Sequence, residues 1–80
     1  MNKLFIIVPK DSLLNSYLLN NYLVYDKFWD SEDWVCYKQH VFSKPMETIT
    51  FLVTMFMLSD FSVNCNYGDY TFQVRSHSTL

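Results

Sequence analysis

The longest apolar run of the chain lies between Lys44 and Asp60, and the rest of the fold is expected to form around it. Pro45 suits the first position of a helix, because its fixed φ fits there and its missing N–H would have no helical partner. Glu47 follows in the first turn, where a carboxylate meets the positive end of the helix dipole. The run is longer than a typical strand and lacks an internal turn residue, so the pattern predicts a helix.

This predicted helix is apolar around most of its circumference. Four apolar residues share one face at helical spacing and are expected to face the core: Ile49, Leu52, Val53 and Phe56. Three more lie beside that face: Phe51, Met55 and Leu58. A chain of 80 residues has little material to cover both sides of such a helix. We therefore predict a homodimer with the second group at its interface.

The N-terminal part of the chain predicts a strand followed by a short helix. Residues 4–8 are all apolar and are followed by Pro9, which is typical of an interior strand covered on both faces. Asp11 or Ser12 is expected to cap a helix that ends at the pair Asn20 and Asn21. The residues of this helix expected to face inward are Leu14, Tyr17 and Leu18.

The remaining strands are predicted from alternation of apolar and polar residues. Residues 34–42 alternate in this way, and so do residues 61–65 and 70–75. The last two segments flank residues 66–69, where Gly68 can take a positive φ, so they are expected to form a hairpin with one buried face.

Together these elements predict a single α+β domain over residues 1–80, a small two-layer sandwich in the order β-α-β-α-β-β. We expect a four-stranded mixed sheet with two helices on one face. The long connection from residues 4–8 to residues 34–42 would allow a parallel, right-handed crossover between those two strands. Residues 77–80 are expected to fray.

Composition and charge narrow the environment and the partners. Half of the residues are hydrophobic and 19% are aromatic, which is too apolar for a disordered chain. The net charge is −2 and the six basic residues are scattered singly, so the sequence shows no basic patch that would follow a phosphate backbone. The apolar part of residues 1–8 is too short for a signal peptide, and residues 49–58 are too few for a bilayer span. We expect a cytoplasmic protein with no membrane partner.

The side chains best suited to metal binding or catalysis do not form a recognisable motif. They are Cys36, His40, Cys65 and His77. On a strand the first two would be about 13 Å apart, which is too far for one zinc ion, and none of the four stands in a close ligand pair. Both cysteines are expected to be small buried hydrophobic residues, without a disulfide. With one glycine the chain also lacks a phosphate-binding loop, and we predict no cofactor, no metal and no catalytic residue.

An acidic and aromatic segment is the strongest candidate for a binding surface. Its members are Tyr25, Asp26, Phe28, Trp29, Asp30, Glu32, Asp33 and Trp34. Aromatic anchors among carboxylates are typical of a protein-binding patch that attracts a basic partner. The alternative interpretation is that Phe28, Trp29 and Trp34 close one end of the core while the acids keep a loop soluble.

These features predict a non-enzymatic protein-protein interaction module. In size and charge the chain resembles small phage-encoded inhibitors that block a host nucleic-acid-handling or defence protein through an acidic surface. The alternative is a single-stranded nucleic-acid-binding protein in which Tyr37, Tyr67 and Tyr70 stack on bases from the sheet. Direct nucleic-acid binding is disfavoured by the charge of the chain.

Overall fold

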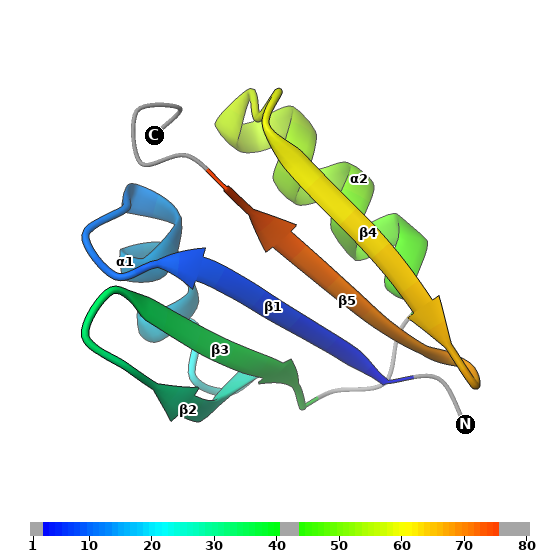
Figure 1. Ribbon diagram of the computed structural model, residues 1–80, viewed down its shortest axis with the longest axis horizontal. Coiled ribbons are helices and arrows are strands. Elements are labelled where there is room, and N and C mark those ends of the chain that lie inside the picture. The colour runs from blue at the N-terminus through cyan, green and yellow to red at the C-terminus, as the bar shows by residue number, and fades with distance from the viewer. Residues whose placement is uncertain (1–2, 41–43, 76–80) are drawn as a thin grey trace.

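The computed structural model describes residues 3–40 and 44–75, which form five strands and two helices in the order β1-α1-β2-β3-α2-β4-β5 (Figure 1). The strands are β1 (Leu4–Pro9), β2 (Tyr25–Asp30), β3 (Trp34–Gln39), β4 (Phe61–Asn66) and β5 (Asp69–Val74). The helices are α1 (Leu13–Asn20) and α2 (Pro45–Phe56). Val41 and Phe42 of the predicted third segment, and the predicted frayed end, lie outside the described residues.

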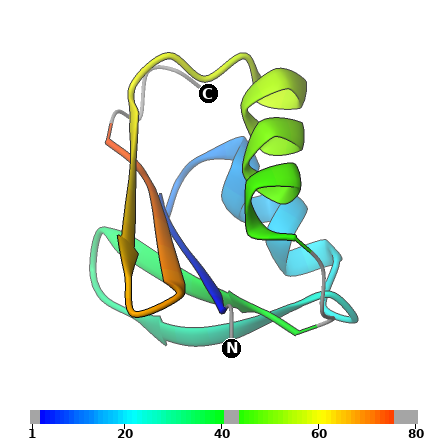
Figure 2. The same ribbon diagram turned by 90° about the vertical axis from the view of Figure 1, so that its right-hand side faces the viewer.

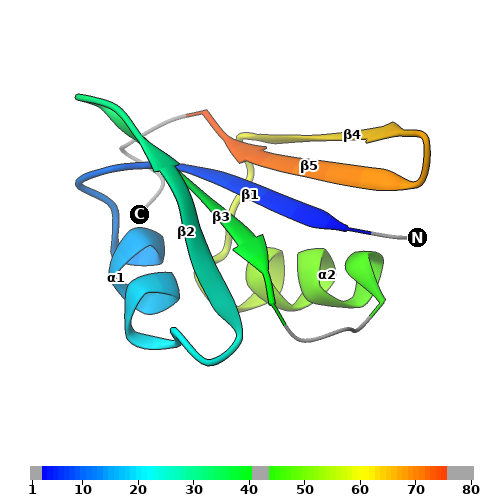
Figure 3. The same ribbon diagram turned by 90° about the horizontal axis from the view of Figure 1, so that it is seen from below.

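The strands form one mixed sheet in the order β2-β3-β1-β5-β4, with β1 in the middle. β1 pairs with β3 antiparallel and with β5 parallel. Both helices cover the same face of the sheet, as the edge-on views show (Figures 2 and 3). The predicted α+β class, mixed sheet and pair of helices are therefore confirmed. We refer to the sheet face away from the helices as the open face.

Two features of the predicted topology are wrong. The sheet has five strands, because residues 25–30, expected as a loop, form β2. The strand after it, β3, runs antiparallel to β1 and not parallel. The hairpin of β2 and β3 reverses the chain once more than expected, and β3 enters the sheet between β2 and β1. The parallel neighbour of β1 is instead β5, which comes last in the chain.

The core lies between the sheet and the two helices. In β1 the alternate residues Leu4, Ile6 and Val8 are buried beneath the helices, whereas Phe5 and Ile7 are half-buried on the open face. The interior position predicted for this strand is confirmed. The other large contributors from the sheet are Tyr25, Val35, Tyr37, Phe72 and Val74.

Helix α1 has the ends that the sequence predicts. Of the two cap candidates the structure selects Ser12, whose hydroxyl accepts a hydrogen bond from the N–H of Asn15 at 3.1 Å and donates one to the carbonyl of Pro9 at 2.7 Å. Asn21 follows the last turn, and its side-chain amide donates to the carbonyl of Tyr17 at 2.7 Å. Leu14 and Leu18 are buried, which anchors this short helix to the sheet.

Helix α2 begins at Pro45 and buries its predicted inner face, with Ile49 and Leu52 in the core. It ends where Met57 takes a left-handed conformation with φ 53°. That turn directs Leu58 into the core, where it is 5% exposed, so Leu58 does not belong to the outer surface predicted for it. None of the described helices has the length and apolar character needed to cross a bilayer.

The predicted C-terminal hairpin is confirmed, and its register places Phe61 opposite Val74 and Asn66 opposite Asp69. Tyr67 and Gly68 make the turn with φ values of 53° and 85°. One expectation fails: Cys65 is exposed and not buried, because it lies at the turn end of the hairpin.

Candidate docking surface on the open face of the sheet

A bulge in β2 turns two consecutive aromatic residues toward the open face. The ladder to β3 shifts its register between Lys27 and Trp29, which leaves Phe28 without a cross-strand partner. Trp29 pairs with Cys36, whose side chain belongs to the open face because its neighbours along β3 are buried under the helices. Phe28 reaches the same face, since its ring lies 5.3 Å from that of Phe5 between centroids.

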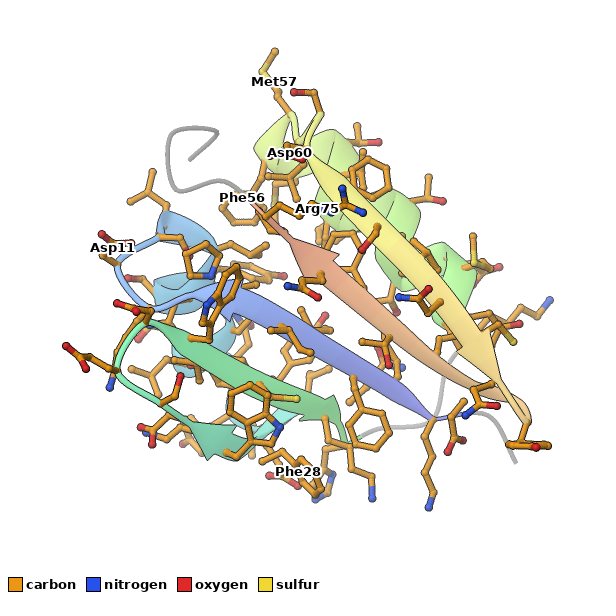
Figure 4. All side chains as sticks on the ribbon, in the orientation of Figure 1. Asp11, Phe28, Phe56, Met57, Asp60 and Arg75 are labelled. Atoms are coloured by element: carbon orange, nitrogen blue, oxygen red, sulfur yellow. The ribbon has the colours of Figure 1, made fainter. Side chains whose placement is uncertain are left out.

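We call the resulting group the aromatic patch, and it consists of Phe5, Phe28, Trp29 and Trp34. Phe28 is 59% exposed and Trp29 is 42% exposed, and the other two rings are half-buried. Figure 4, which faces the open side of the sheet, shows Phe28 at its lower edge. Phe28 and Trp29 thus expose neighbouring aromatic rings on the open face.

The patch covers a cysteine that would otherwise face water. Cys36 is 1% exposed even though it lies on the face without helices. Its burial raises the pKa of the thiol from 9.0 to about 11. The thiol is therefore neutral at physiological pH and acts as part of the packing beneath the rings, not as a nucleophile.

The carboxylates expected to attract a partner divide into two groups. Asp26 lies 3.7 Å from the imidazole of His40. Asp30 lies 3.0 Å from the ammonium of Lys27 and 3.9 Å from that of Lys10. A hydrogen bond from Lys27 and the charges of both lysines lower the pKa of Asp30. The charge that Asp30 presents to a partner is thus partly compensated by these two lysines.

Glu32 and Asp33 form the second group, in the turn between β2 and β3. Both are exposed, and neither carboxylate forms an ion pair within residues 3–40 and 44–75. With Lys10 and Asp11 they line a shallow, open depression. Among the described residues no three His, Cys, Asp or Glu side chains come together as metal ligands would. These two acids are the part of the segment best placed to act on a partner at a distance.

One predicted member of the surface lies elsewhere. Tyr25 is buried in the core, with its ring 6.5 Å from that of Tyr17. Burial, and to a smaller extent the charge of Tyr17, raise the pKa of Tyr25 to about 12. The alternative interpretation, in which Phe28, Trp29 and Trp34 close the end of the core, does not hold for the first two, whose rings are exposed, whereas Trp34 is half-buried.

The structure adds Phe5 to the surface, a residue that the sequence reasoning assigned to a strand covered on both faces. The sequence did indicate this position, because successive side chains of a strand point to opposite faces of the sheet. Residues 4, 6 and 8 of β1 therefore share one face, and Phe5 lies on the other. What the sequence did not show was that helices cover only one of those faces. Phe5 therefore depends on the patch itself for cover.

The tyrosines proposed to stack on bases are mostly unavailable on the sheet. The Tyr37 hydroxyl donates a hydrogen bond to the side-chain oxygen of Asn15 in α1, and its ring is 2% exposed. Tyr70 lies on the helix side, partly buried against the core. Tyr67, which is 96% exposed, sits in the hairpin turn.

Comparison of the chain with protein-family models, with curated proteins and with solved structures found no match.

Proposed function

We propose that this chain is a non-enzymatic protein-interaction module that docks through the aromatic patch. The observation that carries the proposal is the bulge in β2, which places Phe28 and Trp29 side by side on the open face. A regular strand would have sent one of the two rings to the helix side. Exposed aromatic rings rimmed by polar groups are typical of the energetic centre of a protein interface.

The charges beside the patch support a partner with a basic surface. Glu32 and Asp33 lie in the turn that joins the two strands carrying Trp29 and Trp34. Uncompensated carboxylates at the rim of an interface mainly raise the association rate and select against acidic partners. In this proposal the chain inhibits a nucleic-acid-handling or defence protein by occupying its basic surface, in the manner of small phage-encoded inhibitors.

Self-association through α2 belongs to the same proposal. Phe51 and Met55 stand one turn apart on the outer side of the helix and are 50% and 42% exposed. A second copy of the chain would bury this stripe, and a dimer would present two aromatic patches to the partner. The interface proposed here consists of these two residues without Leu58.

The test uses affinity capture from the native cell followed by titration of the captured protein. We expect the double variant Phe28→Ser, Trp29→Ser to bind at least about 30-fold more weakly, the loss of about 2 kcal/mol expected of a hot spot. The matched control is Leu13→Ser, Leu23→Ser, which removes two exposed apolar side chains elsewhere on the surface and should leave the affinity unchanged. Equal affinity of both double variants would reject the patch as the docking surface.

The rim charges have their own measurement. Glu32→Lys, Asp33→Lys should slow association with the captured protein by about tenfold or more at low salt and flatten its salt dependence, because these acids would no longer attract a basic surface. An unchanged association rate would show that the partner is not recognised through its basic charge.

A second candidate function is single-stranded nucleic-acid binding through the patch. Lys38 lies on the open face next to Phe5, so a cation adjoins the exposed rings, which is the arrangement that base stacking uses. This version replaces the sheet tyrosines with Phe28 and Trp29. If it is correct, oligothymidine should quench the fluorescence of Trp29, and the logarithm of the binding constant should fall linearly with the logarithm of the salt concentration. No quenching at low salt would eliminate it.

A further inference from the structure

The outer edge of β4 carries a row of backbone N–H and C=O groups that pair with no residue in 3–40 or 44–75. β4 is the last strand of the sheet, and its inner side pairs with β5. The carbonyl of Asp60 accepts from the N–H of Arg75 at 3.0 Å, so the even-numbered residues of this strand direct their backbone toward β5. The N–H and C=O groups of Phe61, Val63 and Cys65 must then point outward. Within the described chain none of them has a partner.

The two edges of the sheet differ in their protection against another strand. β2 carries a bulge and three charged residues, which are the usual means of blocking an edge. β4 has the sequence FSVNCN, with no charge and no proline, and its register with β5 is regular from end to end. This contrast indicates that the edge at β4 can accept an additional strand, whereas the bulge and charges of β2 block such pairing.

The position of α2 decides what can pair there. Helix α2 runs behind β4 on the covered side of the sheet (Figures 1 and 2). If two copies joined β4 to β4, their α2 helices would lie about 5 Å apart, the spacing of neighbouring strands. Packed helices need about 8–10 Å between axes, so a second copy does not fit. An extended segment without a helix behind it meets no such obstacle.

Side chains on the helix side favour an uncharged segment. Phe61 and Val63 face the helices and are only half-buried, so an added strand could cover what they still expose. On the open face the strand carries Ser62, Asn64 and Asn66, which are neutral and polar. A segment that alternates apolar and small polar residues would match both faces.

We propose that β4 binds an extended, uncharged segment of a partner protein, which adds to the sheet as a sixth strand. Three residues with one N–H and one C=O each give six backbone groups for this pairing. This site lies at the opposite edge of the sheet from β2, so the two proposed surfaces can be tested separately.

The first test is selection of a random eight-residue peptide library on the chain, with counter-selection on Val63→Pro. Proline at this position removes an outward N–H and is tolerated at an open edge, whereas Asn64→Pro removes a bond to β5 and should lower the melting temperature more. Val63→Lys provides a second block that keeps the backbone N–H. We expect enriched peptides of alternating apolar and polar residues that bind at least tenfold more weakly to both Val63 variants. Failure to enrich such peptides would overturn the proposal.

The second test is amide hydrogen exchange of the chain with and without a selected peptide. Without peptide, the amides of Phe61, Val63 and Cys65 should exchange much faster than those of Ser62 and Asn64, and the peptide should slow them. Protection of the three outward amides in the free, dilute chain would show that its own residues cover the edge. Protection that rises with protein concentration would show that a second copy occupies it, and either result would overturn the proposal.

Discussion

Cys36 and Cys65 show how the position of a residue in the sheet sets the chemistry of its side chain. Both occur in strands, yet Cys36 is buried beneath the aromatic patch and Cys65 is exposed at the end of the hairpin. The buried thiol has a pKa of about 11 because desolvation penalises the thiolate. The free energy of unfolding therefore depends on whether the Cys36 thiol is ionised.

This coupling predicts a loss of stability at alkaline pH. Below pH 9.0 both the folded and the unfolded chain hold the Cys36 proton, and no effect arises. Between pH 9.0 and about 11 the unfolded chain releases it while the folded chain retains it, so stability falls as pH rises. A pKa difference of about two units between the folded and unfolded chain corresponds to a loss of about 2–3 kcal/mol in the free energy of unfolding. Tyr25 should lower the stability further above pH 10.0, because its pKa is also raised in the folded chain.

Urea unfolding between pH 8 and 10 measures this slope. Cys36→Ala should make the free energy of unfolding depend less on pH between pH 9 and 10. This change of slope is expected even if the substitution also alters the stability at pH 8. Cys65→Ala is the control, because it removes the thiol that lies exposed at the end of the hairpin and leaves Cys36 in place. Equal slopes in the wild type and Cys36→Ala would contradict the assignment.

At the scale of single elements, two tight turns each hold a residue other than glycine at a positive φ. Met57 ends α2 with φ 53°, and Tyr67 takes the same φ in the hairpin turn. A side chain with a Cβ is disfavoured in this region by about 1 kcal/mol. Both side chains project into solvent, at 85% and 96% exposure, so neither conformation is compensated by packing of the side chain itself. Figure 4 shows Met57 extending beyond the end of the helix.

Replacing Met57 by glycine should therefore stabilise the fold. We expect Met57→Gly to raise the free energy of unfolding by about 0.5–1 kcal/mol, since glycine is the preferred residue after a helix that ends in a left-handed turn. Thr54→Gly, in the exposed interior of the same helix, should instead lower it by about 0.3–0.5 kcal/mol, the difference between the helix propensities of threonine and glycine. Chemical denaturation of the three proteins gives the comparison. A destabilised Met57→Gly variant would refute the argument.

At the scale of the whole molecule, the two proposed interfaces leave apolar side chains exposed to solvent. The aromatic patch lies on the open face, and Phe51 and Met55 are exposed on α2, the helix that covers the other face of the sheet. A domain of this size buries only about 60% of its unfolded surface, so association is a direct way to gain stability.

Sedimentation equilibrium checks the proposed self-association. We expect the wild type to dimerise at micromolar concentration and Phe51→Ser, Met55→Ser to remain monomeric, because the variant removes the apolar stripe on α2. Thr50→Ser, Thr54→Ser changes the same helix without removing a large apolar group and should dimerise as the wild type does. A monomeric wild type over the whole concentration range would refute an interface on α2.

Local signals account for the parts of the fold that could be predicted. Ser12 and Pro45 mark the starts of the two helices, and Gly68 lies in the turn of the hairpin. Each of these acts on its own backbone or on residues within one turn, so its effect can be recognised without knowledge of the rest of the chain. The central position of β1 was predicted from five consecutive apolar residues, although the cover expected on both faces is present on one face only.

The strand β2 could not be predicted in this way. Its bulge interrupts the alternation that identifies a strand, and as an edge strand it exposes every residue except Tyr25. A segment of charged and aromatic residues without a clear period is typical of a loop. Pairing with β3 makes it a strand, and that pairing depends on residues elsewhere in the chain.

The amino-acid sequence by itself determined where the helices begin, where the last hairpin turns and which side of α2 enters the core, because neighbouring residues decide these through backbone geometry and periodicity. Only the tertiary structure decided which aromatic residues face water. Trp29 and Tyr25 are similar in character and four residues apart, yet one is exposed and the other buried. Their difference arises from strand order and from a one-residue shift in register, which depend on contacts between distant segments.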